Sequence, residues 1–317
     1  MKIPSLSQFF SRTSPRVGWF AVGIKNDGVH FAHVKPGAKP QVQVCAFHAA
    51  ENVTPALLEK LRKDARIAGF QFTTLLLPGE YQMLLVDAPN VPLEEMKTAI
   101  RWRVKDMLSY MIEDATLDVL RIPASKIAEG RPQSLYAIAA PNSTIQARVT
   151  LFEKAKINLN VIDIPEMAQR NIAVLFEEEG RGLALLAFDE SGGLLTFTCD
   201  GELYLARRIE ITLTQLREPN ESQRQLSMER LELEMQRSMD YFGRQYIHIT
   251  VARLLVSAPK ELGLAQLLAP ALDVPVEQLD LAQVLDISIV PELADSVFAA
   301  QAFFTLGAAL RQERRIL

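Results

Sequence analysis

A strand–turn–strand pattern occurs twice in this chain, about half a chain apart, and constrains the fold more than any other feature. The first copy runs from Gly18 to Val34 and turns at Asn26-Asp27-Gly28. The second copy begins at Gly182, turns at Ser191-Gly192-Gly193 and continues to Ile209. Two apolar runs joined by a polar, Gly-bearing turn predict a β-hairpin. The duplication therefore predicts two similar α/β domains that face a cleft.

Length and composition agree with two folded domains. A chain of 317 residues, 49% of them hydrophobic, has enough apolar material for two cores. The formal charge of -4 and the lack of basic residues interleaved with aromatics give no reason to expect nucleic acid. Cys45 and Cys199 each lie in an apolar, strand-like run, so we expect buried, reduced thiols.

The sequence predicts a cytoplasmic protein. No stretch approaches the roughly 20 apolar residues that a membrane span requires, and polar residues interrupt the apolar start that a signal peptide would need. Residues 1–16 form a separate N-terminal arm with Lys2, Arg12 and Arg16 and no acidic residue. The arm is either loosely docked or a short amphipathic element that touches an anionic membrane or a partner.

The order of predicted elements is mixed α/β. Thr54-Pro55 predicts a helix start, because Thr is a good N-cap and Pro suits the first turn. A long helix is predicted over Pro92–Met111. Its apolar residues share one face: Leu93, Met96, Ile100, Val104, Met107, Leu108 and Met111. A second amphipathic helix is predicted over Ser222–Arg244, with a Met-rich stripe that we assign to the core.

These elements predict three units. We expect residues 17–165 to form domain one, with residues from about 90 to about 140 as an inserted subdomain. We expect residues 166–317 to form domain two, closed by a C-terminal helix over 295–311. A strand pair over 118–122 and 134–140 belongs to the inserted subdomain.

Three stretches carry a resemblance to a known family. They are Pro92–Trp102, Tyr136–Pro141 with Asp163–Glu166, and Phe303–Arg311. They resemble the helix that begins the inserted subdomain, the crossover into domain two, and the closing helix of the PilM family of type IV pilus assembly proteins. Within that family the chain is most similar to the branch that serves mannose-sensitive haemagglutinin (MSHA) pili. The resemblance implies a two-domain actin-like fold, which is a duplicated ribonuclease H-like unit with an inserted subdomain.

The nucleotide motifs of this fold are altered here. Actin-like ATPases carry an Asp after the first strand to order Mg²⁺-bound water, and Lys25 stands at that position. A lysine cannot ligate Mg²⁺, although it can contact a phosphate as a point charge. The family's Gly-rich adenosine turn corresponds to Val256-Ser257-Ala258-Pro259, which has no glycine. Pro259 also lacks a backbone donor.

The second hairpin keeps part of the motif. Asp189, Ser191 and Gly192 remain, while Glu190 adds a negative charge that would repel a nucleotide. If a nucleotide binds, we expect it at Lys25, Asp189, Ser191 and Gly192. Our expectation is no catalysis and no cofactor, with weakly bound Mg-ATP as the alternative. No metal site is expected, because His30 and His33, three apart on a strand, point to opposite faces.

The resemblance implies a non-enzymatic cytoplasmic scaffold of the pilus assembly platform. Such a protein binds the cytoplasmic tail of a single-span inner-membrane protein and so lies at the inner membrane through its partner. Trp102 is the candidate contact, because tryptophan is enriched among interface hot spots and this one lies off the apolar stripe. Packing between subdomains is the other interpretation of Trp102. Two further functions stay open: a nucleotide-dependent switch, and the cytoplasmic part of a type II secretion platform.

Overall fold

The computed structural model describes residues 17–65, 67, 69–123 and 133–312. The predictions for the arm over 1–16 and for the connection over 124–132 fall outside the described residues.

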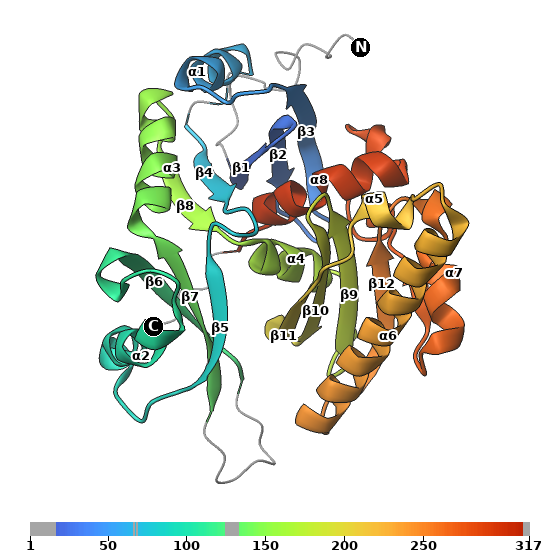
Figure 1. Ribbon diagram of the computed structural model, residues 1–317. Coiled ribbons are helices and arrows are strands. Elements are labelled where there is room, and N and C mark those ends of the chain that lie inside the picture. The colour runs from blue at the N-terminus through green and yellow to red at the C-terminus, as the bar shows by residue number, and fades with distance from the viewer. Residues whose placement is uncertain (1–16, 66, 68, 124–132, 313–317) are drawn as a thin grey trace.

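Two five-stranded sheets share one topology (Figure 1). The first has the order β3-β2-β1-β4-β8, and the second has the order β11-β10-β9-β12-β13. In each sheet the first three strands pair antiparallel, and the last two run parallel to the first. The predicted duplication is therefore confirmed. The strands are β1 (Trp19–Lys25), β2 (Gly28–Lys35), β3 (Gln41–Ala49), β4 (Gln71–Leu75), β8 (Leu159–Asp163), β9 (Gly182–Asp189), β10 (Gly192–Cys199), β11 (Glu202–Ile209), β12 (Val251–Ser257) and β13 (Val276–Gln278).

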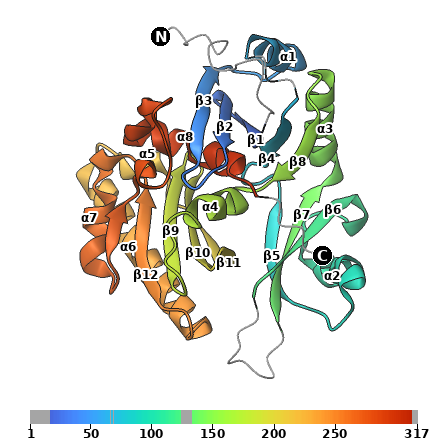
Figure 2. The same ribbon diagram turned by 180° about the vertical axis from the view of Figure 1, so that it is seen from behind.

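Two helices, α4 (Pro165–Ala173) and α8 (Ser296–Ala309), lie between the sheets, as both views show (Figures 1 and 2). Although α4 follows the first sheet in sequence, its Gln169 amide donates to the carbonyls of Leu185 (2.8 Å) and Leu194 (3.1 Å) in the second sheet. The closing helix α8 packs mainly on β1 and β2 of the first sheet. Each helix therefore covers the sheet of the other half.

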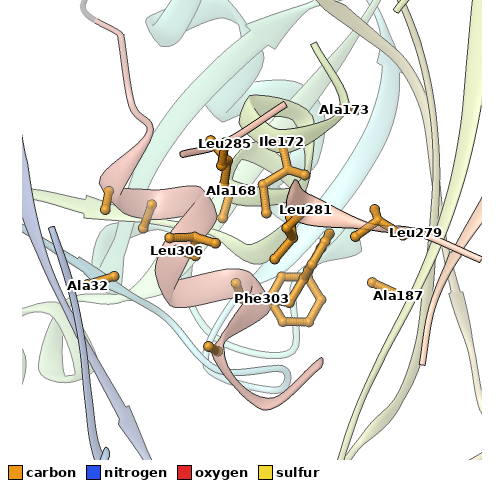
Figure 3. Close-up of a cluster of buried hydrophobic side chains, with 14 of the residues drawn as sticks. Ala32, Ala168, Ile172, Ala173, Ala187, Leu279, Leu281, Leu285, Phe303 and Leu306 are labelled. Atoms are coloured by element: carbon orange, nitrogen blue, oxygen red, sulfur yellow. The ribbon is translucent and has the colours of Figure 1, made fainter. Parts of the chain in front are cut away.

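The two central helices touch backbone to backbone. A Cβ built on Gly307 of α8 would lie 2.2 Å from the carbonyl oxygen of Ala168 in α4. Around this crossing one buried cluster joins both sheets, with Ile172, Ala187 and Phe303 among its members (Figure 3). Burial of this shared core holds the two halves together.

The outer faces of both sheets are covered by helices. On the first sheet, α1 (Pro55–Asp64) and α3 (Asn142–Lys154) pack over Phe20 and Phe72. The Thr54 hydroxyl accepts a hydrogen bond from the Leu57 N–H (3.2 Å), so the predicted N-cap is confirmed. On the second sheet lie α5 (Leu213–Leu216), α6 (Glu221–Gln245) and α7 (Leu264–Leu268). The apolar stripe of α6 is core as predicted, with Met235 fully buried.

A third sheet forms the inserted unit, with the order β5-β7-β6. Its strands are β5 (Gln82–Asp87), β6 (Ala115–Arg121) and β7 (Ser134–Pro141). Helix α2 (Met96–Val104) covers one face, and Tyr136 on the other face joins the core of the second half. The predicted strand pair is confirmed as β6–β7. Because β5 belongs to this sheet, the unit includes residues before position 90, where we expected it to start. The division into domains stays a prediction.

The continuous helix predicted over Pro92–Met111 is wrong. A 3-10 turn at Leu93–Glu95 precedes α2, another at Lys105–Met107 follows it, and a third spans Ile112–Asp114. The Arg101 guanidinium donates to the Ala115 carbonyl (3.2 Å), which lies where the chain returns to enter β6. This tertiary contact and the pairing of β6 outweigh the helical pattern. As a result Met107 and Met111 are 47% and 69% exposed, although the pattern had placed them on the buried face.

Candidate functional site

The tips of the two duplicated hairpins approach each other. Lys25 ends β1, and its ammonium lies within electrostatic reach of Asp27 in its own turn and of Asp189 and Glu190 in the other. Burial lowers the pKa of Lys25, and these carboxylates oppose that effect. The structure thus brings together the residues that the sequence assigned to one cleft.

Lys25 is already bonded to the protein. Its Nζ donates to the backbone carbonyl of Gln301 in α8 (2.8 Å). One turn further along α8, Thr305 lies so close to Gly23 that a Cβ there would be 2.4 Å from its Oγ1. The first hairpin therefore rests on α8, and its lysine holds that contact.

Asp189 is also engaged on both oxygens. Its Oδ1 accepts from the N–H (2.8 Å) and the hydroxyl (2.5 Å) of Ser191, and its Oδ2 lies 3.7 Å from Nη1 of Arg208. Gly192 is required by the backbone, because its φ is 137° and a Cβ would lie 2.5 Å from the Ile209 carbonyl oxygen. All these residues have structural roles within the hairpin itself.

A buried polar network extends from Asp189 toward the inserted sheet. Arg208 of β11 lies beside Glu166 at the start of α4, with Nε 3.6 Å from Oε1. The Tyr81 hydroxyl donates to Oε2 of Glu166 (2.5 Å) and lies 3.4 Å from Nη2 of Arg208. Burial, followed by the charge of Glu166, raises the pKa of Tyr81 well above its usual value. The network ties together three segments that are distant in sequence.

No sequence motif points to this network. Glu166 appeared only as part of the crossover stretch, and neither Tyr81 nor Arg208 belongs to a recognisable motif. The partners are separated by 85 residues (Tyr81 and Glu166) and 127 residues (Tyr81 and Arg208). The one signal in the sequence is an acidic residue directly after a proline, Pro165-Glu166.

An open groove of about 320 Å³ lies beside this network. It runs between the inserted sheet and β11, the outermost strand of the second sheet. Its lining includes Tyr81, Met83, Tyr136, Glu166, Ala206 and Arg208. One side is therefore mostly apolar and the other carries charge.

The two histidines of β2 face opposite ways. His30 packs on Phe47 and lies with its Nε2 3.1 Å from Oδ1 of Asp27, whereas His33 packs on Phe70. Burial, helped by the nearby Lys25 charge, lowers the pKa of His30 to about 4. Over the described ranges no group of three or more His, Cys, Asp or Glu side chains could hold a metal ion.

The turn at the adenosine position is packed into the fold. Ala258 is buried, and the Lys260 N–H donates to the hydroxyl of Ser296 at the start of α8 (3.0 Å). The structure thus places this turn against the closing helix.

Trp102 lies apart from these residues, on α2. It is 70% exposed, while Met96, Ile100 and Val104 of the same helix are buried. The interpretation that Trp102 packs between subdomains is therefore wrong. In the part of the chain that the structure describes, no helix combines the length and apolarity needed to cross a bilayer.

Two copies of the same five-strand unit, joined by a pair of crossing central helices, define an actin-like fold. No family model matches this sequence, and neither does any curated protein. Among solved structures the fold matches the PilM–PilN type IV pilus biogenesis complex, with a TM-score of 0.69 and 20% identity. That match covers 92% of this chain and 99% of the other.

Two further structures show weaker likeness. The cytoplasmic domain of EpsL, an inner-membrane component of the Vibrio cholerae type II secretion system, matches at a TM-score of 0.49 and 12% identity, over 77% of this chain and 83% of its own. A Bacteroides thetaiotaomicron protein with an actin-like ATPase fold and unknown function matches at 0.49 and 8% identity, over 92% and 99%.

Proposed function

We propose that this chain is a non-enzymatic scaffold of a type IV pilus assembly platform, of the MSHA type. It binds the cytoplasmic tail of a single-span inner-membrane protein, and it lies in the cytoplasm at the inner membrane through that partner. The observation that carries the proposal is that Lys25, Asp189 and Arg208 are each bonded to the protein itself. The likeness of the fold to a chain of the PilM–PilN type IV pilus biogenesis complex supports a protein partner for this chain.

The charges around the cleft argue against a nucleotide. Four carboxylates, those of Asp27, Glu166, Asp189 and Glu190, surround the two cations Lys25 and Arg208. Both cations have acceptors already, so a triphosphate would meet a surplus of negative charge. Ordering Mg²⁺ would also require Asp189 to give up Ser191 or Arg208.

Two other functions remain candidates. A nucleotide-dependent switch would use Lys25, Asp189, Ser191 and Gly192, with weakly bound Mg-ATP, to change partner affinity. A type II secretion platform protein would use the same fold in a different membrane assembly. The approach of the two hairpin tips is the observation that favours the switch. The type II secretion alternative depends on the similar architecture expected of such a platform protein.

Calorimetric titration of the full chain tests the proposal. One titration uses Mg-ATP, and the other uses the cytoplasmic tail peptide of its pilus-operon membrane partner. We expect heat of binding from the peptide alone. Nucleotide binding that changes peptide affinity would favour the switch, and a peptide that does not bind would overturn the scaffold proposal.

A thermal melt with and without millimolar Mg-ATP gives an independent check. A ligand that binds the native state raises the melting temperature. An unchanged midpoint is expected. The Asp189→Asn variant is the matched control, because a nucleotide effect that depends on this carboxylate would disappear in it.

A further inference from the structure

The outward edge of β11 is partly covered by a tyrosine hydroxyl. Oη of Tyr136, from the inserted sheet, accepts from the Ala206 N–H (3.2 Å) and lies 3.4 Å from the Tyr204 carbonyl oxygen, to which it donates. A residue of a neighbouring parallel strand accepts a hydrogen bond from one residue of the edge and donates one to the residue two positions earlier. The tyrosine hydroxyl makes the same two bonds and so takes the place of one such residue. Along this part of β11 the fold uses a side chain where a sixth strand could pair.

The edge continues beyond the tyrosine without such cover. Backbone groups of alternate residues point to the same side of a strand, so the Ala206 carbonyl and the Arg208 N–H face the same way as the Ala206 N–H. Neither takes part in a backbone hydrogen bond outside the sheet among the residues that the structure describes. Both residues line the groove of about 320 Å³. The groove therefore presents an unpaired backbone donor, the Arg208 N–H, and an unpaired backbone acceptor, the Ala206 carbonyl, two residues apart on β11.

The two walls of the groove set the side-chain chemistry of an occupant. Met83 and Tyr136 of the inserted sheet and the ring of Tyr81, just before β5, lie on one side, and Glu166 and Arg208 lie on the other. A strand presents its side chains alternately to opposite sides. An extended segment with apolar residues at every second position would match both the hydrogen-bonding edge and the apolar wall.

We propose that an extended segment of the partner's tail docks here as a short added strand on β11, with alternate apolar side chains against Met83 and Tyr136. This inference rests on the proposed function and specifies the site and the chemistry of the ligand. The open edge spans Ala206 to Arg208, so backbone pairing is short and the apolar wall supplies much of the affinity.

Amide hydrogen exchange on the full chain tests the mode of binding. The probe is the partner's tail peptide at saturating concentration. We expect exchange of the Arg208 amide to slow by about tenfold or more, which corresponds to about 1.4 kcal/mol of protection. Amides of the β1–β2 turn should not change. A bound peptide that leaves β11 unprotected would overturn the strand-addition site while the scaffold function stands. A peptide that does not bind at all would overturn both.

A matched pair of variants tests the groove wall. Met83 and Leu85 are two apart on β5 and so share a face, but only Met83 lines the groove, and Leu85 is 43% exposed. We expect Met83→Glu to weaken peptide binding by about tenfold or more, and Leu85→Glu to change it by less than about twofold. Equal effects of the two variants would overturn the site. If Met83→Glu does not fold, the exchange experiment on the unaltered chain decides.

Discussion

The two hairpins have the same topology but opposite chemistry at their tips. The first ends in Lys25, whose ammonium is held by a carbonyl of α8. The second ends in Asp189, whose carboxylate is held by Ser191 and Arg208. In both, the residue at the phosphate position is bonded within the protein. The comparison shows that the same strand topology can carry a lysine in one half and an aspartate in the other, each side chain being bonded within the protein.

The strands behind the tips differ as well. The second strand of the first hairpin, β2, carries the buried histidines His30 and His33. Its counterpart β10 carries only Gly, Leu, Thr, Phe and Cys, none of which titrates between pH 4 and 7. The second strand of the first hairpin should therefore respond to acid between pH 4 and 7, and its counterpart in the second hairpin should not.

The largest expected effect on stability comes from forcing apart the two helices that join the halves. Gly307→Ala places a methyl group 2.2 Å from the Ala168 carbonyl oxygen, so α4 and α8 must move apart. We expect a loss of about 3 kcal/mol of unfolding free energy, or more. Urea denaturation measures it. Gly243→Ala is the control, because nothing lies within 4 Å of its Cβ, and helix propensity should stabilise that variant by about 1 kcal/mol. Equal urea midpoints for Gly307→Ala and Gly243→Ala would contradict the close contact between α4 and α8.

Acid should distinguish the two hairpins. The pKa of His30 is about 4 in the folded protein and 6.5 for an unperturbed histidine. The unfolded chain therefore binds this proton first, and stability falls as the pH drops from 6.5 toward 4. The full loss is about 3 kcal/mol below pH 4. Unfolding free energy measured from pH 7 to 4 should fall less in His30→Gln by about that amount. If the two proteins lose unfolding free energy equally as the pH falls, His30 is not the source of the loss.

The two cations of the cleft, Lys25 and Arg208, should contribute unequally to stability. Arg208→Met leaves Glu166, which is 3% exposed, without its cation, and we expect a loss of about 2 kcal/mol. Lys25→Met removes an ammonium whose burial already lowers its pKa, so we expect a change of less than about 1 kcal/mol. Chemical denaturation of both variants ranks them. A larger loss of unfolding free energy in Lys25→Met than in Arg208→Met would contradict this ranking.

The smallest effect on stability is expected at Trp102. This side chain is 70% exposed, so Trp102→Ala should change the unfolding free energy by less than about 0.5 kcal/mol. If it contacts the partner, affinity for the tail peptide should fall by about tenfold. Titration calorimetry on a normally folded variant measures this affinity. Unchanged affinity would remove Trp102 from the interface.

Much of the local structure could be predicted because its signals are short-range. The hairpin turns, the Thr54 cap and the core stripe of α6 each depend on residues a few positions apart. The helix over Pro92–Met111 could not be predicted correctly, because Arg101 and the pairing of β6 draw the chain out of the helix. A local pattern does not contain the contacts that compete with it.

The sequence by itself determined that two similar α/β units occur and that the first tip carries a lysine and the second an aspartate. Only the tertiary structure decided that α4 and α8 each cover the other half's sheet, and that Tyr81, Glu166 and Arg208 meet beside an open strand edge. The physical reason is that turns and caps are formed by neighbouring residues. The cleft network and the groove form only when segments about a hundred residues apart bury their polar groups together.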